Sequence, residues 1–169
     1  MKTKAESRWK LGPRVGRSLA AVAMSLVAQS AVADAPPAES EMLVLYDRMQ
    51  TAMADDSSAG VEEAAKALAA KSEAVGAKAT DPSAYKAVTD GARAVVAAAD
   101  LEAEREAFRD LSLAMAKLVD SGELKGAGLF FCPMADAYWL QKAGDDALRN
   151  PYYGKSMLTC GSKVDKVED

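Results

Sequence analysis

The feature that most constrains the fold is a change in the character of the chain at Gly122. Before Gly122, apolar residues recur at intervals of three and four, which is the spacing of one face of an α-helix. After Gly122, glycines, aromatic residues and turn-forming pairs follow one another closely up to residue 161. The sequence therefore predicts a helical part over residues 39–121 and a C-terminal segment of different structure.

Four amphipathic helices account for the helical part. Their connections are short, and short connections favour antiparallel neighbours. We therefore expect an all-α protein, an up-down four-helix bundle, with an irregular, aromatic-rich C-terminal segment packed on it. The alternative at Asp100 is that the third and fourth helices form one bent helix.

Capping residues predict where these helices begin and end. Ser57 or Ser58 can accept hydrogen bonds from the free N–H groups at the start of the second helix. Asp81 can do the same for the third helix, and Pro82 suits its first position because proline has no N–H to leave unpaired. Gly122 follows the fourth helix, where a residue with positive φ is often needed.

The first 33 residues have the pattern of a secretory signal peptide. They contain six basic residues, then a short apolar run, then small residues at Ala31 and Ala33. A retained N-terminal anchor is the alternative, although the apolar run is short for a membrane span. We expect a periplasmic protein with no membrane span after cleavage. The predicted division is a signal peptide at 1–33, a mobile leader at 34–38, the domain at 39–163 and a frayed tail at 164–169.

Composition excludes several classes of function. Residues 34–169 carry 15 basic and 24 acidic side chains, which gives no electrostatic reason to bind nucleic acid. The chain has no histidine, so it has no Ser-His or Cys-His catalytic pair, no imidazole-bound zinc or copper(II) and no C-x-x-C-H haem attachment. It also lacks a Gly-rich phosphate loop. We therefore expect a protein that is not an enzyme and binds neither haem nor nucleotide.

Sulfur remains as the chemistry available for metals. The only two cysteines each lie beside a methionine: Cys132 and Met134 in C-P-M, and Met157 and Cys160 in M-x-x-C. Residues two apart in extended backbone point to the same side, and residues three apart share one face of a helical turn. Thiolate and thioether sulfur together select copper(I). The four side chains are therefore candidate ligands of one metal site.

A disulfide is the main alternative for the same cysteines. Exported proteins with an even number of cysteines commonly pair them, and a Cys132–Cys160 bond would close a loop of about 29 residues. The chain-entropy estimate for such a loop is about 3.5 kcal/mol of stabilisation. The residues alone leave a metal site, a disulfide and two buried free thiols open.

Motifs in this segment also carry a resemblance to a known family. "FCPMADAYWLQ", "NPYYG" and "MLTCG", preceded by "REAFRDLS", resemble a bacterial exported domain of unknown function. That domain also occurs fused to periplasmic adaptor subunits of copper/silver-type heavy-metal efflux pumps. The resemblance implies a helical bundle and an association with copper or related metals. It implies the ligands Cys132, Met134, Met157 and Cys160, within a framework of Trp139, Asn150, Pro151, Tyr152 and Gly154.

The resulting hypothesis is a periplasmic copper(I)-binding protein for metal buffering, delivery or efflux support. Its partners would be the metal ion and a periplasmic efflux-pump or copper-handling protein. Aromatic side chains of the C-terminal segment would exclude water from the site. The alternative is a disulfide-stapled structural or interaction module of the cell envelope that binds no metal. The aromatic side chains concerned are Tyr138, Trp139, Tyr152 and Tyr153.

Overall fold

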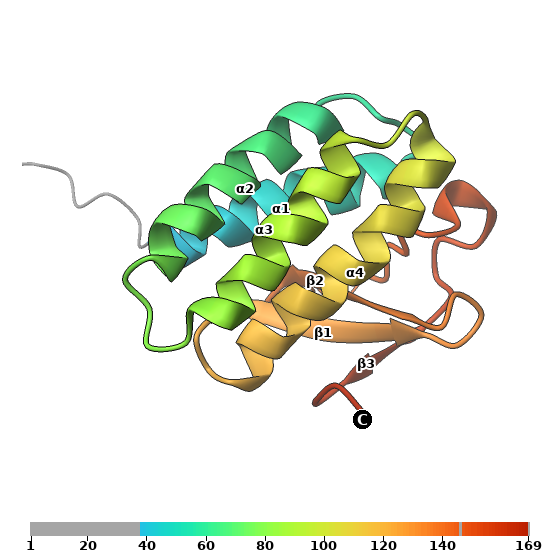
Figure 1. Ribbon diagram of the computed structural model, residues 1–169. Helices are drawn as coiled ribbons and strands as arrows, with labels where there is room; N and C mark the ends of the chain where they lie inside the picture. The colour runs from blue at the N-terminus through green and yellow to red at the C-terminus, as the bar shows by residue number, and fades with distance from the viewer. Residues whose placement is uncertain (1–37, 146, 169) are drawn as a thin grey trace, which may run out of the picture. The chain divides into compact units, whose positions relative to one another are not determined.

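The computed structural model describes residues 38–145 and 147–168. The expected signal peptide and residues 34–37 lie outside these described residues. Four helices are followed by three short strands and one turn of 3₁₀ helix (Figure 1). The elements are α1 (Ala38–Ala54), α2 (Val61–Gly76), α3 (Pro82–Val96), α4 (Leu101–Asp120), β1 (Ala127–Cys132), β2 (Ala137–Lys142), η1 (Gly154–Ser156) and β3 (Ser162–Val164).

The four predicted helices are confirmed, and each packs on the next along the chain. Consecutive helices alternate in direction, with α2, α3 and α4 side by side and α1 behind them (Figure 1). Small residues let them approach closely: a Cβ added at Gly91 would lie 2.8 Å from the Cα of Leu111 on α4. Since real Cβ atoms do not come this near to a backbone atom, the α3–α4 contact depends on a residue without a side chain.

The predicted cap at Asp81 is present, and Asp100, where the sequence predicts only a possible break, also caps a helix. The Asp81 carboxylate accepts a hydrogen bond from the Ser83 N–H at 2.9 Å, and Pro82 follows as the first residue of α3. The Asp100 carboxylate accepts from the Ala103 N–H at 2.9 Å. The cap at Asp100 begins a new helix, so α3 and α4 are separate rather than one bent helix.

The predicted cap of α2 is wrong. This helix begins after Gly60, which has a φ of 76° and offers no side chain for capping. Ser58 instead donates its hydroxyl hydrogen to the Glu104 carboxylate on α4 at 2.7 Å. The Ser57 hydroxyl accepts from the Ala59 N–H within its own turn.

The all-α class is also corrected, because the C-terminal segment forms a three-stranded antiparallel sheet in the order β2-β1-β3. Phe130 of β1 lies opposite Trp139 of β2 and opposite Lys163 of β3. The β1–β2 connection includes Asp136, whose φ of 49° lets the chain reverse between two apolar, aromatic runs. Such runs fit a pleated surface that is half buried.

The C-terminal tail, which the sequence predicts to be frayed, is tied to the sheet. Val164 is the last residue of β3 and pairs with Leu129. Further on, the Val167 N–H donates to the Asp120 carboxylate and the Glu168 N–H to the Tyr138 hydroxyl, both at 2.9 Å. Backbone hydrogen bonding therefore extends the ordered domain to Glu168.

One hydrophobic core joins the helices to the sheet. Tyr46 of α1 stacks on Phe108 of α4 with 4.9 Å between ring centroids, and its hydroxyl shares a hydrogen bond of 2.6 Å with Ser112. The same hydroxyl accepts from the Leu140 N–H of β2. Four methionines are fully buried here, so they serve as core side chains, as their helical spacing predicts. These are Met42, Met49, Met53 and Met115.

Candidate functional site

The two cysteine side chains lie together at one end of the sheet. Cys132 is the last residue of β1, and Cys160 follows the turn after η1. Their sulfur atoms are 3.3 Å apart, which is in contact but well beyond the roughly 2.05 Å of a disulfide bond. Both thiols are free; Cys132 is fully buried, whereas Cys160 is half-buried. The structure thus brings two residues 28 positions apart to a single dithiol site.

The two candidate methionine ligands border Cys160 through their backbone. The Met134 N–H hydrogen-bonds to the Cys160 sulfur, and the Cys160 N–H donates to the Met157 carbonyl at 2.9 Å. Their side chains reach the surface, with 63% of Met134 and 37% of Met157 exposed. Among the large apolar side chains of the described residues, only these two and Val44 are exposed. Both methionine side chains are therefore accessible to solvent, on residues whose backbone contacts Cys160.

The ionisation of Cys160 reflects this neighbourhood. The hydrogen bond with Cys132 raises the pKa of the Cys160 thiol, and desolvation and the charge of a Cys132 thiolate raise it further. The Met134 N–H opposes this by stabilising the thiolate. The balance keeps the thiol form of Cys160 favoured to higher pH than usual, so any metal must displace a firmly held proton.

Asn150 fixes the segment that carries Cys160. Its side-chain amide donates to the Cys160 carbonyl at 2.8 Å, and its side-chain oxygen accepts from the Tyr152 N–H at 2.8 Å. Its own N–H donates to the Leu158 carbonyl at 2.7 Å. Asn150 has no exposed surface, so water cannot replace these bonds if the amide is removed.

Two arginines of α4 fasten the loops on either side of the site. Arg105 donates to the Pro151 carbonyl at 2.8 Å, to the Met53 carbonyl at 2.6 Å and to the Asp56 carboxylate at 2.8 Å. Arg109 donates to the Ala135 carbonyl in the β1–β2 connection. Arg105 is only 13% exposed, so it does not belong to a solvated charged face of α4.

Aromatic rings close the inner side of the dithiol site. Trp139 is fully buried, stacks on Phe130 at 5.3 Å and meets Tyr152 edge-on at 6.5 Å. Gly161, next to Cys160, lies so near that an added Cβ would be 2.5 Å from the Trp139 ring. The Tyr153 hydroxyl donates to the Met134 carbonyl at 2.9 Å. The rings therefore support the backbone of both sulfur motifs.

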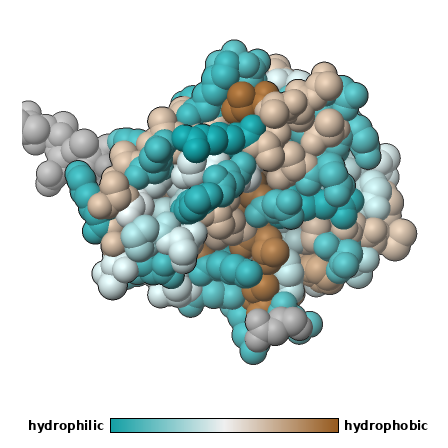
Figure 2. Space-filling view, in the orientation of Figure 1, coloured by the Kyte–Doolittle hydropathy of each residue, from teal (hydrophilic) through white to brown (hydrophobic). Residues whose placement is uncertain are grey.

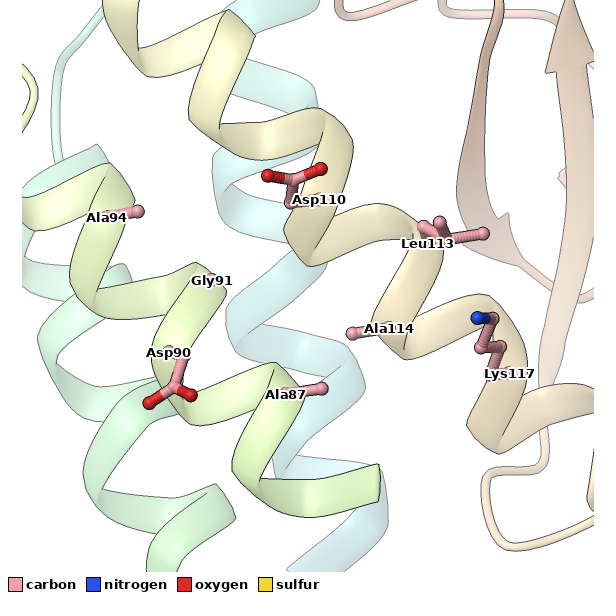
Figure 3. Close-up of a pocket in the computed structure, with 8 residues that line it drawn as sticks. All are labelled: Ala87, Asp90, Gly91, Ala94, Asp110, Leu113, Ala114 and Lys117. Carbon is pink, nitrogen blue, oxygen red and sulfur yellow. The ribbon is translucent and has the colours of Figure 1, made fainter. Parts of the chain in front are cut away.

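In the described part of the chain, the other hollows on the surface contain no cysteine. Figure 3 shows one between α3 and α4, with Gly91, Ala87 and Ala114 at its floor and charged side chains of both signs around it. The face drawn in Figure 2 is mostly covered by hydrophilic side chains, with small, separate apolar patches. Within the described residues, no three Cys, Asp or Glu side chains are grouped so that they could hold a metal ion.

A family model matches residues 42–126, and its description is a protein of unknown function, DUF3347. The match covers half of the 169-residue chain. The chain belongs to this family. No curated protein and no solved structure matches the chain.

The match to DUF3347 covers almost all of the helical part and ends just before β1. Both cysteines therefore lie beyond the matched residues, in the segment that completes the core of this DUF3347 chain. In the part of the chain that the structure describes, no helix has the length and apolar character needed to cross a bilayer.

Proposed function

We propose that the protein is an exported soft-metal-binding protein that holds copper(I) between Cys132 and Cys160. The observation that carries this proposal is the 3.3 Å separation of the two sulfur atoms. Thiolates bound to one metal ion at about 2.3 Å lie roughly 3.8 to 4.6 Å apart, from tetrahedral to linear geometry. A small outward movement of the half-buried Cys160 therefore makes room for an ion.

The methionines complete the proposed site. Copper(I) accepts thioether sulfur, and Met134 and Met157, whose side chains are exposed, hydrogen-bond to Cys160 through their backbone groups. Aromatic rings exclude water from the inner side, which protects the reduced ion. An open outer side with two methionines suits a protein that buffers copper(I), delivers it or supports its efflux.

The test is an anaerobic titration of the reduced protein with copper(I) against a coloured chelator. We expect one ion per chain, lost in Cys132→Ser, and weaker binding in a Met134→Leu, Met157→Leu double variant. Ser162→Ala, a substitution of an exposed residue near Cys160, is the matched control and should bind normally. Binding by Cys132→Ser as tight as that of the parent would exclude the assignment.

The same distance also supports a second candidate, a Cys132–Cys160 disulfide in a structural or interaction module. The sulfurs need to approach by little more than 1 Å to bond. Intact mass measured without reductant distinguishes the two. A mass lower by two hydrogens, with no copper uptake after reduction, would leave only the structural function.

A further inference from the structure

The two sulfurs of the dithiol site differ in what can reach them. Cys132 has no exposed surface, whereas Cys160 is half-buried and hydrogen-bonds to backbone groups of Met134 and Met157. Thiol–disulfide exchange requires a direct approach of one sulfur to another. An external thiol therefore reaches the sulfur of Cys160 before that of Cys132, whether the two cysteines are reduced or joined in a disulfide.

We propose that a dithiol reductant exchanges with this pair through Cys160, and that this exchange decides whether the metal site exists. The exchange itself depends only on the two cysteines. Its consequence for copper rests on the proposed function, because a thiolate pair can bind the ion and a disulfide cannot. The partner is defined by its chemistry: a dithiol whose thiolate can approach the half-buried Cys160 from solvent.

The proposed reaction balances as a two-electron exchange. A thiolate of the partner attacks the Cys160 sulfur, the Cys132–Cys160 bond breaks, and Cys132 leaves as a thiolate that takes up a proton. The partner's second thiol then loses its proton and attacks the partner sulfur that is bonded to Cys160. This releases the Cys160 thiolate, which is protonated in turn. The protein gains two electrons and two protons, and the partner becomes a disulfide.

The reverse reaction follows the same path. Cys160 attacks the partner's disulfide, and Cys132 then displaces the partner from Cys160. The sulfur separation of 3.3 Å places Cys132 in contact with the sulfur that it must attack.

The experiment compares Cys132→Ser with Cys160→Ser as full chains, both reduced, using glutathione disulfide as the probe. We expect the Cys132→Ser variant, which keeps Cys160, to form a glutathione adduct at least about tenfold faster than Cys160→Ser. In denaturing urea the two rates should become equal, which shows that burial causes the difference. Equal rates in the folded proteins, or faster reaction at Cys132, would overturn the proposal.

A second measurement needs no variant. The wild-type disulfide form is mixed with reduced glutathione, quenched in acid and mapped by mass spectrometry. Glutathione on Cys160 supports the proposal, and glutathione on Cys132 refutes it. Copper(I) titration of the reduced wild type is scored separately. Exchange at Cys160 without copper binding would leave the exchange through Cys160 standing and remove the proposed function, together with the consequence of the exchange for copper. Copper binding with exchange at Cys132 would leave the proposed function standing and overturn the exchange through Cys160.

Discussion

The helical part and the C-terminal segment are stabilised in different ways. Between the helices, apolar side chains interdigitate and small residues such as Gly91 allow close approach. In the C-terminal segment, polar side chains bind backbone groups: the Gln141 amide donates to the Ala147 carbonyl, and Asn150 donates to the Cys160 carbonyl. This segment has little regular structure between β2 and β3, so buried side chains satisfy the groups that a helix would satisfy by itself.

The difference predicts which substitutions each region tolerates. An apolar core accepts other apolar side chains of similar volume at modest cost. A loop held by a single buried amide does not tolerate replacement of that amide, because each lost hydrogen bond leaves a buried backbone group without a partner. The dithiol site lies in the second kind of structure, so its geometry depends on individual hydrogen bonds.

The largest effect is expected at Phe108, where the two regions meet. Its ring stacks on Tyr46 of α1 and lies 6.4 Å from the ring of Tyr152. Phe108→Ala should lower the free energy of unfolding by about 3–5 kcal/mol. Urea unfolding followed by far-UV circular dichroism and by Trp139 fluorescence, in a Trp9→Phe background, measures the helical part and the C-terminal segment separately.

The two probes also test whether the regions form one cooperative unit. We expect coincident midpoints in the parent and in Phe108→Ala, because one core joins both regions. Phe108→Leu, which keeps most of the volume, should recover much of the loss. Separate midpoints in the parent would contradict this and make the C-terminal segment an independent unit.

Asn150→Ala should have the next largest effect, about 2–4 kcal/mol, because it leaves the Cys160 carbonyl and the Tyr152 N–H buried without partners. The matched control is Gln50→Ala, a buried amide of α1 whose side chain donates to the Arg149 carbonyl. We expect the control to lose about 1 kcal/mol, since it removes one hydrogen bond to the loop and a long one, 3.4 Å, from the neighbouring Thr51 hydroxyl. Chemical denaturation measures both variants, and equal losses would count against the special dependence of the loop on Asn150.

Arg105→Lys should cost about 1–2 kcal/mol. The guanidinium reaches the carbonyls of Pro151 and Met53 together with the Asp56 carboxylate, whereas an ammonium group cannot reproduce this planar set of bonds. Arg93→Lys is the control, because its ion pair with Glu73 is mostly exposed and should change stability by less than about 0.5 kcal/mol. A similar result for both arginines would show that Arg105 acts only as a surface charge.

The parts of the fold that were predictable from sequence have local causes. Asp81 and Asp100 bond to N–H groups two and three residues away, so their signal lies within a short window. The Arg105 bond to the Pro151 carbonyl spans 46 positions, and nothing beside Arg105 in the sequence indicates it. The helical spacing around Arg105 looks the same whether it is solvated or caps a distant loop.

The sequence does contain a pattern that is typical of the β1–β2 hairpin. Two short apolar, aromatic runs are separated by four residues, Pro133–Asp136, a length typical of hairpin connections. β3 had none, because its three residues, Ser162, Lys163 and Val164, form no apolar run. At the site, the motifs indicate both cysteines, but which of the two is buried depends on packing in three dimensions.

The smallest predicted effect is a pH dependence confined to the C-terminal segment. The Cys160 thiol has a raised pKa in the folded, reduced protein, so the unfolded chain loses this proton first as pH rises. Stability from this thiol is therefore complete below the unfolded thiol pKa, about 8.5, and is lost as pH rises towards the folded pKa. Urea unfolding under reducing conditions at pH 7 to 10 should show this decline in the parent and a weaker decline in Cys160→Ala. The opposite result would be a rise in the stability of the parent relative to Cys160→Ala over this pH range. It would mean that the Met134 N–H, which lowers the Cys160 pKa, has a larger effect than Cys132, which raises it.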